Sequence, residues 1–261
     1  MGIGTSLTLQ RFINPNMAET KPLAAEVFDA LSRLDTCTVS NAIERLNVRM
    51  RNEGFIYDSV RCQFPHFPPM LGYAVTGRVR TSSPPVSGIR YYYDRADWWS
   101  YVASLPEPRV LVIQDSDPKP GFGALLGEVH ASIAQAMKCV GCVTNGAVRD
   151  LDGVERLGFH FFSGSVTVSH AYAHIIEFGQ PVEVGGVKIY PGDLVHGDRN
   201  GVHLIPASIA SEIPAAAEAI TKTEQALIEF CRSSNFSFQE LIDRLERLSE
   251  GGRNSAPPQT A

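Results

Sequence analysis

Apolar positions along the chain alternate between helical and strand spacing, which predicts an α/β protein. Helical spacing starts at Pro22 and recurs in four predicted helices: 22–34, 39–46, 94–105 and 125–137. Short runs rich in β-branched and aromatic residues are predicted as strands: 73–80, 109–114, 141–144 and 160–168. The order strand, helix, strand over residues 109–144 predicts a parallel crossover connection.

The later part of the chain has a different sequence pattern. Four short predicted strands are separated by Gly-Gly and Pro-Gly turns: 181–184, 187–190, 193–197 and 202–205. Together with the strand at 160–168, this pattern predicts a compact β meander or barrel. A long helix is predicted at 211–231, and Ser237 can cap a last one. We therefore divide the chain into an N-terminal arm (1–20), a main catalytic domain (21–206) and a C-terminal helical extension (207–250). The last segment, 251–261, is a tail predicted to be disordered by its composition.

Composition and charge narrow the function classes. The 261 residues are 44% hydrophobic and 20% charged, as in ordinary globular enzymes. A net charge of −5 argues against a general nucleic-acid binder, which needs a basic face to displace counterions from phosphates. No apolar run approaches the roughly 20 residues that span a bilayer. The N-terminus also lacks a signal-peptide pattern, so we expect a cytoplasmic protein.

The five cysteines, an odd number, suit a reducing compartment. Cys139 and Cys142 form a C-x-x-C pair, which raises redox and zinc alternatives. A redox pair needs its thiolate at the start of a helix, whereas this pair follows a helix. A structural zinc site needs two further ligands at compatible spacing, and the sequence has no second C-x-x-C. We expect both cysteines to be buried packing residues.

The densest candidate chemistry lies in the segments 127–130 and 145–150. The first begins a helix, whose free N–H groups and positive dipole end attract an anion. The second follows the next strand, and we expect Gly146 to turn the chain so that Arg149 and Asp150 lie beyond the strand's carboxyl end. Arginine suits a carboxylate or oxyanion, and aspartate suits Mg²⁺ or Mn²⁺. Together they predict a site for a small 2-oxo acid; the alternative is a surface ion pair of Arg149 with Asp150 or Asp152.

The spacing Gly127-Glu128-x20-Arg149-Asp150, with Gly141 and Gly146-Ala147-Val148 between, resembles the aldolase and ribonuclease-regulator A (RraA-like) superfamily. That family includes 4-hydroxy-4-methyl-2-oxoglutarate aldolases, which also decarboxylate oxaloacetate, and non-catalytic regulators of ribonuclease E. Further segments with the same resemblance extend the match over about 36–206: 38–42, 72–76, 181–186, 191–193 and 198–206. The resemblance implies an RraA-like swivelling β/β/α domain, an α-β-β-α sandwich, with N-terminal helices and additional C-terminal helices.

The resemblance also implies an activity and a set of roles. The activity is that of a divalent-metal-dependent (class II) lyase, which cleaves a C–C bond of a 2-oxo acid by retro-aldol cleavage or decarboxylation through a pyruvate-type enolate. Arg149 would bind the 2-oxo oxygen or carboxylate and stabilise the enolate. Asp150 would hold Mg²⁺ or Mn²⁺, partly through waters. The substrate carboxylate would be bound by the backbone amides of Gly127, Glu128, Val129 and His130.

One position departs from the family pattern. Family aldolases usually carry an acid three residues after the metal-binding aspartate, and this chain has Gly153 there. Asp152 and Glu155 lie beside it as alternative carboxylates. The resemblance further implies a homotrimer or hexamer with sites between subunits, so a neighbouring subunit is another source of the missing acid.

Histidines and aromatic residues outside these motifs leave alternatives open. His170 and His174 would form a zinc pair only on a helix, and their β-branched neighbours favour a strand. We therefore expect a structural or interface role, with recognition of the substrate as the functional alternative. The side chain of His130 is either an acid–base group or a lid. The aromatic residues at 91–93 and 98–99 are expected in the core or a trimer contact rather than a binding cage.

The contrasting function is a non-catalytic regulator that binds a ribonuclease or another protein. Such regulators consist of roughly one core domain. This chain adds the arm, an irregular excursion at 47–72 and two C-terminal helices, which favours a distinct enzyme. Methyl transfer is disfavoured because no glycine-rich loop follows the first strand to seat an adenosyl cofactor.

Overall fold

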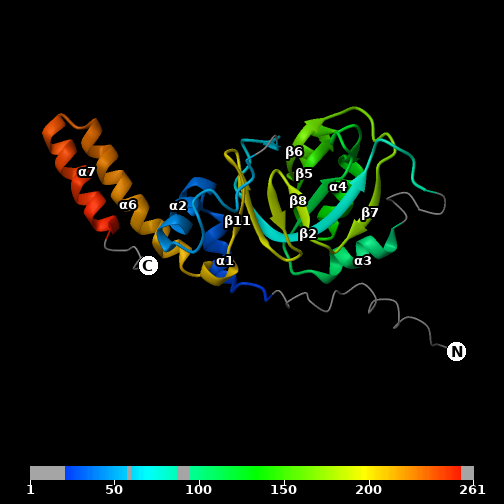
Figure 1. Ribbon diagram of the computed structural model, residues 1–261, viewed down its shortest axis with the longest axis horizontal. Coiled ribbons are helices and arrows are strands. Elements are labelled where there is room, and N and C mark those ends of the chain that lie inside the picture. The colour runs from blue at the N-terminus through cyan, green and yellow to red at the C-terminus, as the bar shows by residue number, and fades with distance from the viewer. Residues whose placement is uncertain (1–20, 58–59, 87–94, 254–261) are drawn as a thin grey trace.

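The computed structural model describes residues 21–57, 60–86 and 95–253 (Figure 1). The predicted N-terminal arm and the tyrosines at 91–93 lie outside the described residues. Within the described part, a nine-stranded sheet and a separate two-stranded hairpin are surrounded by helices, which makes the protein a mixed α/β fold as the sequence predicts.

The centre of the large sheet is parallel. Four neighbouring strands run in the same direction in the spatial order β6 (His160–Val166), β5 (Cys139–Val148), β3 (Arg109–Asp115) and β2 (Met70–Arg80). The outer strands pair antiparallel with this centre or with one another: β1 (Arg61–Cys62), β7 (His174–Phe178), β10 (Leu194–Asp198) and β11 (Gly201–Ile205). The predicted parallel crossover from 109 to 144 is therefore present, with its helix between β3 and β5.

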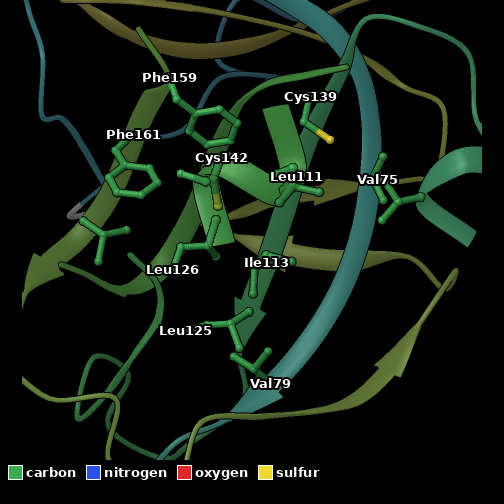
Figure 2. Packing of buried hydrophobic residues seen from close by; sticks show 14 of the residues in the cluster. Val75, Val79, Leu111, Ile113, Leu125, Leu126, Cys139, Cys142, Phe159 and Phe161 are labelled. Carbon is green, nitrogen blue, oxygen red and sulfur yellow. The ribbon is translucent and has the colours of Figure 1, made fainter. Parts of the chain in front are cut away.

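Three helices cover one face of this sheet: α3 (Ala96–Ser104), α4 (Glu128–Ala136) and α5 (Leu151–Leu157). Figure 2 shows Leu111 and Ile113 of β3 beside Cys142 of β5 in the core beneath them. Cys139 and Cys142 are 2% and 0% exposed, and burial raises the pKa of both thiols, that of Cys139 to about 12. The expectation that the C-x-x-C pair serves as core packing is confirmed. Trp98, fully buried in the same cluster, is also a core residue as expected.

The opposite face of the sheet carries the hairpin of β8 (Val182–Val184) and β9 (Val187–Ile189). Gly185 and Gly186 make its two-residue turn with φ of +54° and +79°, a conformation that suits glycine. The strands after residue 160 therefore do not form a meander or barrel of their own, contrary to the sequence-based expectation. Their apolar residues are buried against the parallel centre instead, and only β8 and β9 stand apart from the large sheet.

The remaining helices lie at one end of the sheet: α1 (Ala25–Ser32), α2 (Thr36–Leu46), α6 (Ile213–Arg232) and α7 (Phe238–Arg253). The carboxylate of Asp35 caps α2 by accepting from the Thr38 amide. Leu31, Ile43 and Ile213 pack together against β10 and β11. Helices α6 and α7 form a hairpin that extends away from the sheet (Figure 1), and α7 continues to residue 253, past the predicted start of the tail at 251. Among the described helices, none combines the length and the apolar character that a membrane crossing requires.

Two local predictions around residues 125–150 are wrong. The predicted helix 125–137 begins as a short strand, β4 (Ala124–Leu126), and only then becomes α4. The predicted strand 141–144 is longer and includes Gly146, which does not turn the chain. Both differences arise because β4 pairs with the extended end of β5, a contact between distant segments.

Candidate active site

The parallel pairing of β4 with β5 brings the two candidate segments together. Leu126 lies opposite Val148 in this ladder, and the Arg149 amide donates to the Leu126 carbonyl at 3.0 Å. Gly127 and Arg149 therefore leave the sheet side by side at the carboxyl ends of their strands. This is the edge at which ligands of α/β sheets bind.

The chain turns at Asp150 rather than at Gly146. Gly146 lies inside β5, where the register with β6 shifts, and its amide donates to the Thr144 hydroxyl at 2.9 Å. Asp150 has φ 57° and ψ 42°, in the left-handed region. This conformation costs a residue other than glycine about 1–2 kcal/mol, although aspartate is among the residues that tolerate it best. Such strain at the end of a strand is typical of functional sites.

The carboxylate of Asp150 lies at the start of α4. Its Oδ2 accepts from the Glu128 amide at 3.2 Å and its Oδ1 accepts from Arg149 Nε at 3.2 Å. A Cβ on Gly127 would overlap Asp150 Oδ2, so glycine is needed for this approach. One amide of the first turn is thus already bonded within the chain, and the next donors of that turn are those of Val129 and His130.

A second carboxylate occupies the space above Gly153. A Cβ on Gly153 would overlap the carboxylate of Glu128, which lies 4.0 Å from Arg156 Nη2. Of the two alternative acids, Glu155 pairs with His66 at 3.1 Å and Asp152 is exposed. The sequence predicts a role only for the backbone amide of Glu128. Its side chain supplies a carboxylate next to the position where the sequence lacks the usual acid.

His130 is buried in the first turn of α4, whereas its neighbour Val129 is 60% exposed. The His130 side chain is 5% exposed, and burial together with the positive charges of His170 and Arg149 lowers its pKa to about 3. The imidazole is therefore neutral at physiological pH and buried in this structure.

The His170-x3-His174 pair does not lie on a helix, as expected. His174 begins β7, is 3% exposed, and has Nδ1 at 2.7 Å from the carbonyl oxygen of Tyr172, so it has a structural role. His170 is exposed on the segment that precedes β7. The two imidazoles therefore differ in environment.

The chain belongs to the RraA-like family: the Aldolase/RraA family model matches residues 26–204, more than half of its length. This family includes both aldolase or decarboxylase enzymes and RraA regulators. A Halalkalibacterium halodurans protein named, provisionally, as a 4-hydroxy-4-methyl-2-oxoglutarate aldolase is 34% identical over 84 residues, 32% of this chain and 40% of the relative. Protein DlpA of Legionella pneumophila is 25% identical over 130 residues, 49% of this chain and 21% of that protein. The chain thus matches less than half the length of either curated relative.

Solved structures show the same fold. An uncharacterised protein of Pseudomonas syringae pv. tomato superposes with a TM-score of 0.67 at 24% identity, covering 86% of this chain and 96% of that one. RraAS2 of Streptomyces coelicolor, described as an unusual member of the RNase ES inhibitor RraA protein family, gives a TM-score of 0.62 at 22% identity over 78% and 96% of the two chains. At these identities the likeness concerns the fold alone.

Proposed function

We propose that this protein is a divalent-metal-dependent lyase that cleaves a C–C bond of a small 2-oxo acid through a pyruvate-type enolate. The observation that carries the proposal is the left-handed turn at Asp150. It places the Asp150 carboxylate beside the Arg149 guanidinium and against the first amide of α4. A surface ion pair needs neither the strained backbone nor the glycine at 127 that makes room for it.

Each candidate site residue has a role that follows from its position. The guanidinium of Arg149 is partly exposed and can donate to the oxygen on which the enolate charge develops. The first-turn amides of Val129 and His130 point from the positive end of α4 and can receive the substrate carboxylate. The neutral imidazole of His130, buried in the same turn, adds no charge there.

The donors at the site fit Mg²⁺ or Mn²⁺. Among the described residues, no three His, Cys, Asp or Glu side chains gather as a complete protein cage. Mg²⁺ commonly binds through one or two carboxylates and keeps several waters, and Asp150 offers such a carboxylate in a space that glycine keeps open. When bound, the ion supplies Lewis-acid stabilisation of the oxygen that becomes the enolate.

The test measures pyruvate release by the purified protein. Oxaloacetate and 4-hydroxy-4-methyl-2-oxoglutarate are incubated with the protein in Mg²⁺ or in EDTA, and pyruvate is followed with lactate dehydrogenase. We expect release in Mg²⁺ and its loss in EDTA. Equal turnover in EDTA would refute the metal-dependent mechanism. No pyruvate release from either compound would refute the lyase and favour the regulator. An assay for inhibition of a ribonuclease would then identify the regulator.

A further inference from the structure

The segment 167–173, which joins β6 to β7, leaves the sheet beside Arg149. Its first amide, that of Thr167, donates to the carbonyl of Val148 at 3.0 Å. Val148 is the last residue of β5, immediately before Arg149. The segment therefore starts at the candidate site and carries the exposed imidazole of His170.

Hydrogen bonds hold this segment on both sides of His170. Before it, the carbonyl of Ser169 accepts from the Ala124 amide at 2.9 Å, which ties the segment to the start of β4. After it, the Tyr172 amide donates to the Thr81 carbonyl at 3.1 Å. The segment is thus anchored to the first residue of β4 and to the residue that follows β2.

The turn itself is fixed by an unusual backbone conformation. Ala171 has φ 47°, in the left-handed region, and its amide donates to the Ser169 hydroxyl at 2.9 Å. The His170 carbonyl accepts from the Ala173 amide at 2.9 Å and lies where a Cβ on Gly123 would overlap it. A left-handed alanine is strained and persists only where the surroundings determine it, so this turn presents His170 in one backbone orientation.

Among the described residues, no structural contact of the His170 imidazole explains why the turn fixes the orientation of this residue. It is exposed, and it makes no hydrogen bond or ion pair with the side chains and backbone of the described residues. A positive charge on His170, like that on Arg149, opposes protonation of the buried His130 and contributes to its low pKa. This effect agrees with the backbone contacts, which start the segment beside Arg149 and tie it to β4.

We propose that His170 is the general acid–base residue of the Arg149–Asp150 site, an inference that rests on the lyase function proposed above. Histidine is the side chain best suited to moving protons near neutral pH. The segment that carries this exposed imidazole starts with an amide bonded to Val148, the neighbour of Arg149. His174, whose ring is bonded to the Tyr172 carbonyl, is a positioning residue for the same turn.

In retro-aldol cleavage of a 4-hydroxy-2-oxo acid, the neutral imidazole of His170 takes the proton of the C4 hydroxyl. The C3–C4 bond breaks, the C4–O electron pair forms the leaving carbonyl, and the bond pair becomes the C2–C3 double bond of the enolate. The C2 oxygen takes up the negative charge beside Arg149. The imidazolium then returns the same proton to C3, so the step needs no oxidant or other co-reactant.

Decarboxylation of oxaloacetate makes a different demand on His170. Loss of CO₂ leaves the enolate directly, and no base is required to break the bond. Enolisation of pyruvate, by contrast, requires a base that removes a C3 proton. The two reactions therefore separate the role of His170 from that of Arg149.

The experiment follows exchange of the pyruvate methyl protons in D₂O by NMR, with oxaloacetate decarboxylation measured in parallel in Mg²⁺. The variants are His170→Gln, His170→Ala and, as a control on the same segment, Val168→Ala, whose side chain is 92% exposed. We expect His170→Gln to slow exchange by about 100-fold or more while most decarboxylation remains. Added imidazole should restore exchange in His170→Ala, and Val168→Ala should match the unsubstituted protein.

The outcomes that overturn the inference are distinct from those that overturn the function. Decarboxylation without any methyl exchange, or exchange unchanged in His170→Gln, refutes the acid–base role and leaves the lyase standing. Equal losses in His170→Gln and Val168→Ala, without rescue by imidazole, also refute it, because they indicate a disturbed turn. Absence of both reactions in the unsubstituted protein refutes the lyase and this inference with it.

Discussion

Four buried histidines should make the protein sensitive to mild acid. The four side chains are at most 7% exposed: His130, His160, His196 and His203. Burial, the largest cause at each, lowers their pKa values to about 3, 4, 4 and 3. Because these values lie below the ordinary 6.5, the folded state holds each ring neutral while the unfolded state takes up a proton. The stability they contribute is complete above pH 6.5 and is lost as the pH falls below it.

The hydrogen bonds of one pair show why protonation is resisted. His196 Nε2 lies 3.0 Å from the carbonyl of Leu34, which can only accept, so this nitrogen carries the hydrogen. His196 Nδ1, 2.9 Å from His203 Nε2, must then accept from that nitrogen. A proton added to His196 Nδ1 would set one N–H against another in the core. These hydrogen bonds therefore require a neutral His196, whereas burial is the main cause that keeps His203 neutral.

The magnitude depends mainly on the unfolded state. Between pH 7.5 and 5.0 each histidine costs about 2 kcal/mol, since the interval from 6.5 to 5.0 converts at 1.36 kcal/mol per pKa unit and the folded rings stay neutral. Burial raises the pKa of Asp115 and Asp193, which offsets part of this loss. We expect a net loss of about 4–8 kcal/mol, comparable to the whole stability of many domains.

The assay is urea unfolding at pH 7.5 and 5.0, followed by the fluorescence of the buried Trp98. His160, whose Nδ1 is buried without a hydrogen-bond partner in the described structure, is the best residue to replace. His160→Phe should reduce the difference between the two pH values by about 2 kcal/mol. The control Val154→Ala, a core truncation, should lower stability equally at both. Equal urea midpoints for the unsubstituted protein at the two pH values would refute the reasoning.

Three further predictions concern a buried arginine and the candidate site. Arg109 is 5% exposed and donates to backbone carbonyls at the ends of α3 and α4. Arg109→Met should therefore lower the free energy of unfolding, measured in urea, by about 3 kcal/mol or more, and an unchanged urea midpoint would contradict this. Gly127→Ala should displace the Asp150 carboxylate and weaken Mn²⁺ binding, measured by EPR, by about 10- to 100-fold. Asp150→Asn should abolish Mn²⁺ binding and leave the far-UV CD spectrum unchanged. The control Asp152→Asn, at an exposed position, should bind Mn²⁺ normally. Equal Mn²⁺ binding by both variants would exclude Asp150 as the metal ligand.

Most of the secondary structure could be predicted because local pattern and burial agree. The run at 109–114 is a buried central strand, and Asp35 caps the helix that the spacing at 39–46 indicates. The exception, β4, consists of three apolar residues that suit either a helix or a strand. Its state is decided by pairing with β5, a contact between distant segments that local periodicity does not contain.

The candidate site was predicted in its parts and not in its geometry. Because both segments follow the carboxyl ends of neighbouring strands, Gly127 lies beside Arg149 and Asp150 as the sequence predicts. The predicted turn at Gly146 is wrong, because glycine in a strand can mark a bulge as well as a turn. The position of the Glu128 carboxylate over Gly153 depends on how α4 and α5 pack, and no sequence signal indicates it.

The central claim is that Arg149 stabilises an enolate at a metal-assisted site. The most direct test is kcat/KM for oxaloacetate decarboxylation in Mg²⁺ by Arg149→Met, with Arg247→Met as the control because Arg247 pairs with Glu240 on α7, outside the site. The account predicts a loss of about 10²–10³-fold in Arg149→Met and no loss in the control. Equal activity of the two variants would contradict it.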